Sequence, residues 1–323
     1  MSAVPSEVRF HTTKFDTDEE RGTAAALPAA QRQWMVENLL FEYPLFKEVS
    51  SEVARFHHPV VGGTHGTGAI GGVIGASRSG KSYICKHYAA DYPVQVLEEG
   101  EKYPVVYLEA RGDWTPYHFA EQVFMATGAK SVPSMKTPAL ITASQRRLLK
   151  VGTELVIIDD SHFLLLETKG RVQATFKSLV KGIADIGSCN VLLAGLPGLQ
   201  AFIEGADQLN GSGDFPHWET KPLRWEIEDE REQFMLLLHG IDRRLPFLKL
   251  SGLANPSKAA DFYHGSEGKI GRVMNIIADA ALRAINDGTA CIMMEHLQAA
   301  AIIRMKVGET YRPFYDNRSG ESA

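Results

Sequence analysis

The sequence predicts an α/β fold, in which a parallel β-sheet core is covered by helices and followed by a small all-helical lid. Apolar segments of strand length alternate with segments of helical periodicity over the first two thirds of the chain. This order is typical of parallel sheets with helices on both faces. The apolar segments are residues 73–74, 105–108, 155–158 and 190–194. Beyond about Pro222 only helical patterns occur, at residues 228–238, 257–263, 269–286 and 294–305.

Length and composition indicate a globular protein of about two domains. The chain has 323 residues, of which 44% are hydrophobic and 23% charged, and a domain holds roughly 150 residues. The net charge of −5 argues against a wholly basic nucleic-acid binder but allows a local basic strip. Three cysteines without metal-binding spacing are typical of a reducing compartment. We expect a cytoplasmic protein without a membrane segment, because neither a long apolar run nor a signal-peptide pattern occurs.

The chain ahead of the first strand is expected to hold an arm and two helices. Residues 1–27 are polar, of mixed charge and without a sustained period, which indicates a flexible N-terminal arm. From Pro28 apolar residues recur at helical spacing, with an interruption near Pro44, because the residue before a proline disfavours helical backbone. A glycine-rich loop at 61–68 then leads to the strand.

Residues 75–82 read GASRSGKS and match the phosphate-loop pattern G-x-x-x-x-G-K-[ST]. In such a loop the backbone N–H groups and the positive end of the following helix face the phosphates of a nucleotide. Lys81 would reach the β- and γ-phosphates, and the Ser82 hydroxyl would hold Mg²⁺. A glycine-rich turn with a chance Lys-Ser pair is the alternative, which the flanking strand and helix disfavour. The residues expected to bind ATP are Gly75, Ala76, Ser77, Arg78, Ser79, Gly80, Lys81, Ser82 and Tyr83.

Two helices are expected after the second strand, separated by a loop. Thr115 and Pro116 are typical of a helix start, and Gly128 of a helix end. A second helix is predicted at about 139–150.

Residues 154–160, ELVIIDD, have the pattern of a Walker B strand. An apolar run that ends in two acids is typical of a central parallel strand that delivers carboxylates to its carboxyl edge. Asp159 would bind Mg²⁺ through water, and Asp160 would orient or deprotonate the attacking water. Two acids capping the next helix are the alternative. The phosphate loop about eighty residues upstream makes the Walker B interpretation stronger.

These motifs together resemble an AAA+ ATPase and, more narrowly, the TniB/TnsC family of transposition regulators. The similarity extends over roughly residues 30–305. The resemblance implies four parts: the arm at 1–27, helices and an AAA+ nucleotide-binding core at 28–222, a helical lid at 223–307 and a polar tail at 308–323. The segments that carry the family likeness are 159–162 with 164–166, 245–247 with 251–253, and 268–272 leading into 280–285.

The resemblance implies an ATPase that uses ATP and Mg²⁺ and binds double-stranded DNA without sequence preference. Such proteins assemble head to tail, because each nucleotide site needs a residue from the next copy, and contacts of this kind make rings or helical filaments. The assembly links a TniQ-like target selector to a DDE-type transposase, and ATP hydrolysis dismantles it. No DNA cutting is implied for this chain.

Several positions depart from the family pattern. Asp160 stands where most relatives have Glu, and its shorter side chain should slow hydrolysis more than binding. Leu196, at the usual sensor position, cannot bond to a phosphate, and Asn190 lies at the wrong end of its strand. The arginine finger of relatives follows a Gln-Leu pair, here at 208–209, but no arginine follows it closely.

Other arginines, and one histidine, are candidates for roles at the nucleotide. Arg224, with Arg243 and Arg244 behind it, could serve as the finger, and a surface salt bridge is an equal alternative for each. Arg272, at the start of a lid helix, is expected to contact the γ-phosphate as a catalytic sensor, with a solvated surface position as the alternative. His162 matches a histidine frequent in relatives and is interpreted as structural.

Two basic sets are candidates for DNA contact, and each has a solvated helix surface as an equal alternative. No aromatic-basic or helix-turn-helix pattern indicates base readout. The two sets are Arg171, Lys177 and Lys181 on one helix face, and Arg146, Arg147 and Lys150 near the end of another helix.

The sequence is also compatible with two other classes of function. One is a helicase loader of the MuB/IstB or DnaC type, which neighbouring genes would distinguish from a transposition regulator. The other is a phosphate-loop kinase or a nucleotide-gated defence switch. The helical lid disfavours a kinase.

Overall fold

The computed structural model describes residues 9–60, 62–63, 66–187, 189–206, 209 and 214–315. The expected N-terminal arm and C-terminal tail lie partly outside them, at 1–8 and 316–323, as do most of residues 207–213. The described chain forms two compact units. One holds Leu45–Thr220, and the other holds Arg9–Pro44 together with the chain from Lys221. No helix among the described residues is both long and apolar enough to cross a membrane.

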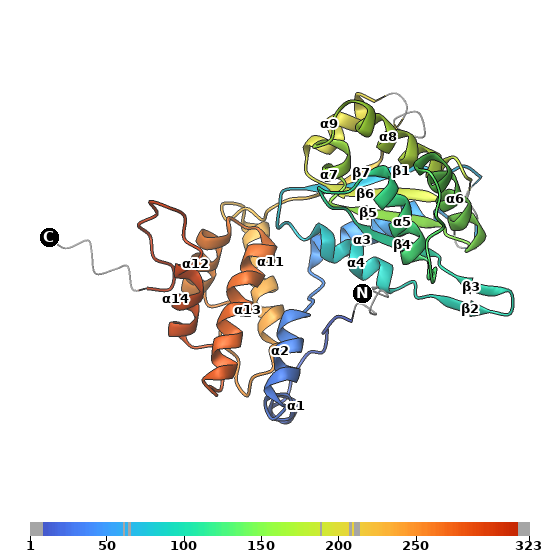
Figure 1. The fold of residues 1–323 in the computed structure, drawn as a ribbon. Helices are drawn as coiled ribbons and strands as arrows, with labels where there is room; N and C mark the ends of the chain where they lie inside the picture. Colours follow the sequence, from blue (N-terminus) through green and yellow to red (C-terminus); the bar gives the residue numbers. More distant parts are fainter. Residues whose placement is uncertain are drawn as a thin grey trace. The chain divides into compact units, whose positions relative to one another are not determined.

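The first unit is built on a parallel five-stranded sheet with the order β4-β5-β6-β1-β7 (Figure 1). Hydrophobic runs make the inner strands, since every residue of β1, β5 and β6 is buried. Hence the phosphate-loop strand β1 lies inside the sheet, and β6 separates it from β5. The strands are β1 Ile70–Gly75, β4 Val105–Glu109, β5 Leu155–Asp159, β6 Asn190–Gly195 and β7 His217–Thr220.

Helices cover both faces of this sheet, as the alternating pattern predicted. The side chains of Ile74, Ile158 and Leu193 point to one face, where they share a core with Phe119 and Phe176 from the covering helices. Figure 1 shows α3 and α4 on the other face. The helices of this unit are α3 Pro44–His57, α4 Lys81–Ala90, α5 Pro116–Ala126, α6 Thr137–Lys150, α7 His162–Leu165, α8 Gly170–Ala184 and α9 Gly198–Glu204.

Helix α5 begins and ends where the sequence predicted. Thr115 is its N-cap and accepts a hydrogen bond from the His118 N–H, and Pro116 is its first residue. Gly128 follows the helix with φ +73°, a left-handed conformation that glycine adopts easily.

Three strands of the structure were not predicted. β7 is a short edge strand of mostly polar residues, only partly buried, so it lacks the apolar run of a central strand. The strands β2 Gln95–Leu97 and β3 Gly100–Lys102 form an antiparallel hairpin. Residues 98–99 make its turn, and Gly100 follows them with φ +131°.

The second unit is all helical and includes helices from both ends of the described chain. From the N-terminal side come α1 Asp18–Ala25 and α2 Ala29–Glu37. The C-terminal helices are α11 Glu228–Asp242, α12 Pro256–Ser266, α13 Ile270–Asn286 and α14 Met294–Ile302.

The structure differs from the expected flexible arm over residues 9–27. Thr17 and Glu20 form a capping box that starts α1, and such a box satisfies two N–H groups of the first turn. The buried guanidiniums of Arg21 and Arg32 donate to the carbonyl oxygens of Phe247 and Pro246. These contacts make residues 9–44 part of the helical unit, whereas the sequence assigned 28–44 to the core.

Candidate nucleotide-binding site

The carboxyl ends of the parallel strands carry both nucleotide motifs. β1 ends at Gly75, β5 ends at Asp159, and β6 lies between them. The strand register also aligns Thr220 with Gly75, and Glu109 with Asp159. Because parallel strands end at the same edge, the loop and the acids meet on one side of the sheet.

The backbone of the phosphate loop depends on two glycines. A Cβ atom on Gly75 would lie 2.1 Å from Thr220 Oγ1 and 2.7 Å from Ser79 Oγ, so no larger residue fits. Gly80 has φ +99° and caps α4, which begins at Lys81. The first N–H groups of a helix have no partner within it. The loop therefore ends in a set of donors suited to an anion.

The Lys81 ammonium lies over this loop. Its side chain is 7% exposed, and Nζ donates to the carbonyl oxygens of Gly75 and Ala76, each at 2.8 Å. Burial lowers the pKa of Lys81, while the charges of Asp159 and Asp160 act in the opposite direction. Thus the structure brings the phosphate-loop lysine within the electrostatic reach of both acids.

Asp159 is held rigidly at the end of β5. It is fully buried. Its Oδ2 atom accepts a hydrogen bond of 2.8 Å from the Tyr107 hydroxyl, and its Oδ1 atom accepts one of 2.9 Å from the Asp160 N–H. Burial raises the pKa of Tyr107, and the Asp159 charge adds to the effect, so the phenol remains a donor. A carboxylate has about four acceptor positions, which leaves room for water on a metal ion.

Asp160 is the more accessible acid. It has φ +50°, an uncommon conformation for a residue other than glycine, and one that costs of order 1–3 kcal/mol. Partial burial raises the pKa of Asp160, and the charge of Asp159 raises it further. A carboxyl group with a raised pKa is a better proton acceptor.

His162 begins α7 beside this acid. Its Nδ1 atom is 3.9 Å from Asp160 Oδ1, which is too long for a hydrogen bond. That atom is buried and has no hydrogen-bond partner among the described residues.

Two residues of the site were missed by sequence reasoning. Tyr107 orients Asp159, as described above. Thr220 Oγ1 is 2.6 Å from Ser79 Oγ and so links the phosphate loop to β7. Tyr107 lies two residues before the end of β4, which is next to β5, and Thr220 is the last residue of β7, which is next to β1. Only the order of the strands reveals what these hydroxyls contact.

Asn190 has a structural role at the opposite edge of the sheet. Its amide accepts from the Ala69 N–H at 2.8 Å and donates to the Phe56 carbonyl at 2.6 Å. This agrees with its expected position away from the nucleotide.

The arginine candidates all belong to the helical unit. Arg272 lies in the first turn of α13, with Nη1 3.3 Å from Glu267 Oε2. Arg224 pairs with Glu230, and Arg243 pairs with Asp16. Arg244 donates to the Gly240 carbonyl at 2.8 Å. Each finger candidate therefore has an intramolecular partner, and Gln208 of the finger motif lies outside the described residues.

The two basic sets have different surroundings. Arg147 donates to Thr127 and lies over the Phe124 ring, so it closes the end of α5. Arg146 and Lys150 are exposed.

The set on α8 is also mixed. Lys177 lies over the Phe202 ring, and Lys181 pairs with Asp185 at 2.9 Å. Arg171 is exposed but lies about 120° around the helix from Lys177, because six residues separate them at 3.6 per turn. The three residues therefore do not share one narrow face.

Comparison with protein families matches residues 70–211 to the family described as bacterial TniB protein. The matched segment contains the phosphate loop and both acids, and the match confirms the predicted resemblance. No curated protein matches the sequence.

Solved structures with a similar fold include ORC and Cdc6 proteins. ORC2 of Aeropyrum pernix, in ADPNP and ADP complexes, has a TM-score of 0.56 at 14% identity over 81% of this chain and 68% of that chain. ORC1 of the same organism, in complex with DNA, has a TM-score of 0.56 at 16% identity over 83% of this chain and 67% of that chain. Cdc6p of Pyrobaculum aerophilum has a TM-score of 0.55 at 10% identity over 91% of this chain and 72% of that chain. These likenesses confirm the predicted AAA+ fold.

Proposed function

We propose that this chain, in which residues 70–211 match the TniB family, is an ATPase that regulates DNA transposition. It binds ATP with Mg²⁺, assembles on double-stranded DNA and releases the DNA after hydrolysis. The match to this family supports the transposition role. The chemistry of the site supports the ATPase activity.

One observation carries the nucleotide part of the proposal. The buried Lys81 ammonium donates to two carbonyls of the phosphate loop and interacts electrostatically with two acids. Triphosphate oxygens offer that ammonium stronger partners than neutral carbonyls do, because hydrogen bonds between charged groups are roughly twice as strong. Binding of ATP would therefore move the lysine from the loop to the phosphates.

The acids divide the chemistry between them. Ser82 and Asp159 would hold Mg²⁺, which neutralises the charge that develops on the phosphates. Asp159 suits this task because Tyr107 and the Asp160 N–H fix its orientation. Asp160 would orient a water molecule and accept its proton. Its side chain is one methylene shorter than the usual Glu, so we expect slow hydrolysis.

Regulation would come from assembly of copies head to tail into a ring or a helical filament. Arg272 of the lid would report the γ-phosphate. In each copy, Arg224, Arg243 or Arg244 would have to exchange its intramolecular partner for the nucleotide of a neighbour. The assembly would link a TniQ-like selector to a DDE-type transposase.

DNA contact would come from the exposed basic residues. Among the candidates, Arg146, Lys150 and Arg171 are exposed, while the other three contact side chains of their own chain. Phosphate contacts would make DNA affinity fall steeply with salt and would be indifferent to sequence.

Calorimetry of ATP binding with Mg²⁺ tests the nucleotide site. We expect Lys81→Ala to abolish measurable binding. Lys47→Ala, which removes an exposed lysine of α3, should bind as the parent does. Equal binding by both variants would contradict the proposed role of Lys81.

Electron microscopy on duplex DNA with a non-hydrolysable ATP analogue tests the assembly. We expect rings or filaments from the parent chain and none from Lys81→Ala. With ATP, Asp160→Ala should give longer-lived assemblies than the parent. A chain that binds the analogue but remains monomeric on DNA would refute the regulatory role while leaving the nucleotide site intact.

A further inference from the structure

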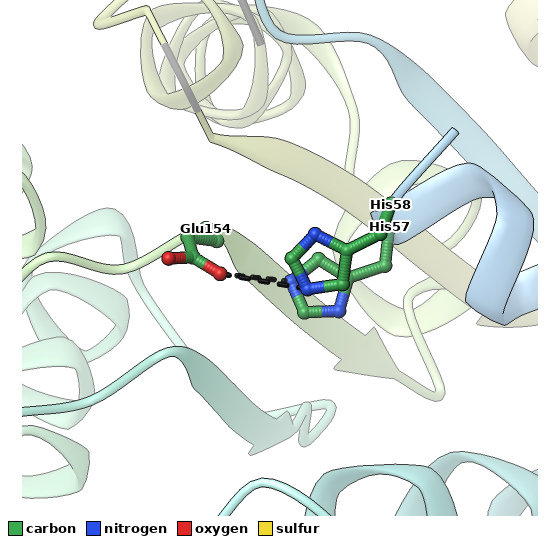
Figure 2. Close-up of side chains that lie close together, drawn as sticks. All are labelled: His57, His58 and Glu154. Carbon is green, nitrogen blue, oxygen red and sulfur yellow. Dashed lines mark ion pairs between the residues drawn. The ribbon is translucent and has the colours of Figure 1, made fainter. Parts of the chain in front are cut away.

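A second group of ligand-type side chains lies at the amino end of β5. His57 ends α3, His58 follows it, and Glu154 comes just before β5. Figure 2 shows both imidazole rings directed at one carboxylate oxygen. The Nε2 atoms of both histidines are 3.6 Å from Glu154 Oε2. We propose that these three side chains bind one divalent transition metal ion, for which Zn²⁺ is the suitable probe.

Hydrogen bonds determine which nitrogen of His57 faces the carboxylate as a ligand. The Tyr88 hydroxyl donates to the Tyr92 hydroxyl at 3.2 Å. His57 Nδ1 lies 2.8 Å from the oxygen of Tyr88, which can then accept an N–H from it. A neutral imidazole carries one N–H, so with that proton on Nδ1 the Nε2 atom presents a lone pair to Glu154 Oε2. Two lone pairs that face each other repel unless a cation lies between them.

The spacing of the ligand atoms fits a metal ion. One nitrogen of each histidine and one oxygen of Glu154 lie within 4.8 Å of one another. Zinc bonds to nitrogen and carboxylate oxygen are about 2.1 Å long, and two such bonds that span the observed 3.6 Å meet at about 118°. That angle is close to the tetrahedral value of about 109° that zinc prefers.

The chemistry of the ligand set is also that of a metal site. Two histidines and one carboxylate bind zinc or iron(II) in known protein sites. The bond from His57 Nδ1 to Tyr88 is the kind of supporting contact that orients a ligand imidazole. The two rings stack with centroids 3.7 Å apart and an angle of 30° between their planes, so His58 packs against the buried His57.

Lys102 is the cation that competes for this carboxylate. Its Nζ atom is 2.7 Å from Glu154 Oε1, while Oε2 faces the histidines. The lysine thus leaves one oxygen for the ion and weakens binding by its charge. This contact also ties the β2–β3 hairpin to the cluster.

The proposed site is distinct from the magnesium site of the nucleotide. Glu154 and Asp159 lie at opposite ends of β5, about 16 Å apart for five residues at about 3.3 Å each. A metal here would connect the end of α3 to the start of β5, so we assign it a structural role.

The zinc content of the full chain after dialysis, measured with millimolar Mg²⁺ present, tests the site. We expect one Zn²⁺ per chain and at least tenfold weaker binding in His58→Ala and in Glu154→Gln. His58 is the better target, because its side chain is 32% exposed whereas that of His57 is fully buried. The control His239→Ala removes an exposed imidazole of α11 and should retain the zinc. Thermal melts without metal verify that the variants fold.

A second variant separates metal binding from a simple ion-pair network. Lys102→Met keeps the side-chain stem but removes the charge, so it should tighten zinc binding severalfold. Zinc should raise the melting temperature of the parent but not that of His58→Ala. Absence of zinc from the parent, equal zinc in His58→Ala, or unchanged affinity in Lys102→Met would overturn the proposal.

Discussion

Replacing Tyr107 with phenylalanine removes one oxygen atom and tests how the magnesium-binding acid is held. The lost hydroxyl donates a 2.8 Å hydrogen bond to Oδ2 of the fully buried Asp159. The aromatic ring, which lies 5.7 Å from Lys86 Nζ, remains. The variant therefore changes the hydrogen bonding of one carboxylate with little change in packing.

The expected magnitude follows from the burial of the acceptor. A hydrogen bond to a charged group contributes about 1.5–3 kcal/mol, and the substitution leaves a fully buried oxygen without this donor. We expect the free energy of unfolding of the sheet unit to fall by about 2 kcal/mol. For a unit of about 180 residues, this corresponds to about 4–8 °C in melting temperature.

Urea denaturation and calorimetry without nucleotide or Mg²⁺ would measure the effect. Tyr103→Phe is the matched control, because the Tyr103 hydroxyl also donates to a carboxylate, at 2.7 Å from Glu101 Oε2, but on the exposed surface. We expect the control to change stability by less than about 0.5 kcal/mol. Equal destabilisation by the two variants would refute the argument that Tyr107 supports a buried charge.

Three further variants test other contacts. Thr220→Val removes the hydroxyl that bonds to Ser79; we expect a loss of about 1 kcal/mol by denaturation and weaker ATP binding by calorimetry, and unchanged values in both would contradict the link. Asp160 has a raised pKa, so its carboxyl group keeps a proton to higher pH in the folded state than in the unfolded state. The stabilisation that comes from this proton falls as pH rises above about 4. Asp160→Asn should lack that decline in melts across pH, and parallel curves would show the argument to be wrong. The hydrogen bonds from Lys269 and Lys306 lower the pKa of Glu267 to about 2, so this contribution is present above about pH 4 and is lost as pH falls towards 2. Glu267→Gln should be less sensitive to acid over that range, and equal acid sensitivity of the two proteins would count against it.

The nucleotide motifs could be predicted because each is continuous in the sequence. The phosphate loop is contained in eight residues, and β5 is an apolar run because it is buried on both faces. By contrast, Tyr107 lies 52 residues from Asp159, and Thr220 lies 141 residues from Ser79. Their contacts depend on the order of the strands, which no local pattern contains.

The N-terminal segment shows a different limit. Thr17 and Glu20 have the spacing of a capping box, but the polar composition around them favoured a flexible arm. What holds the segment is a pair of buried arginines and their carbonyl partners more than 200 residues away. Polar side chains that are buried by distant partners look like surface residues in the sequence.

The discontinuous helical unit has a consequence for synthesis on the ribosome. Residues 9–44 emerge first, yet Pro246 and Phe247, which Arg21 and Arg32 require, follow only after the whole sheet unit. The whole sheet unit is therefore synthesised before residues 9–44 can form these hydrogen bonds. A nascent chain that stops anywhere before Pro246 would leave both guanidiniums without these acceptors, so loss of the chain after the sheet unit would remove the hydrogen-bond partners of the N-terminal helices.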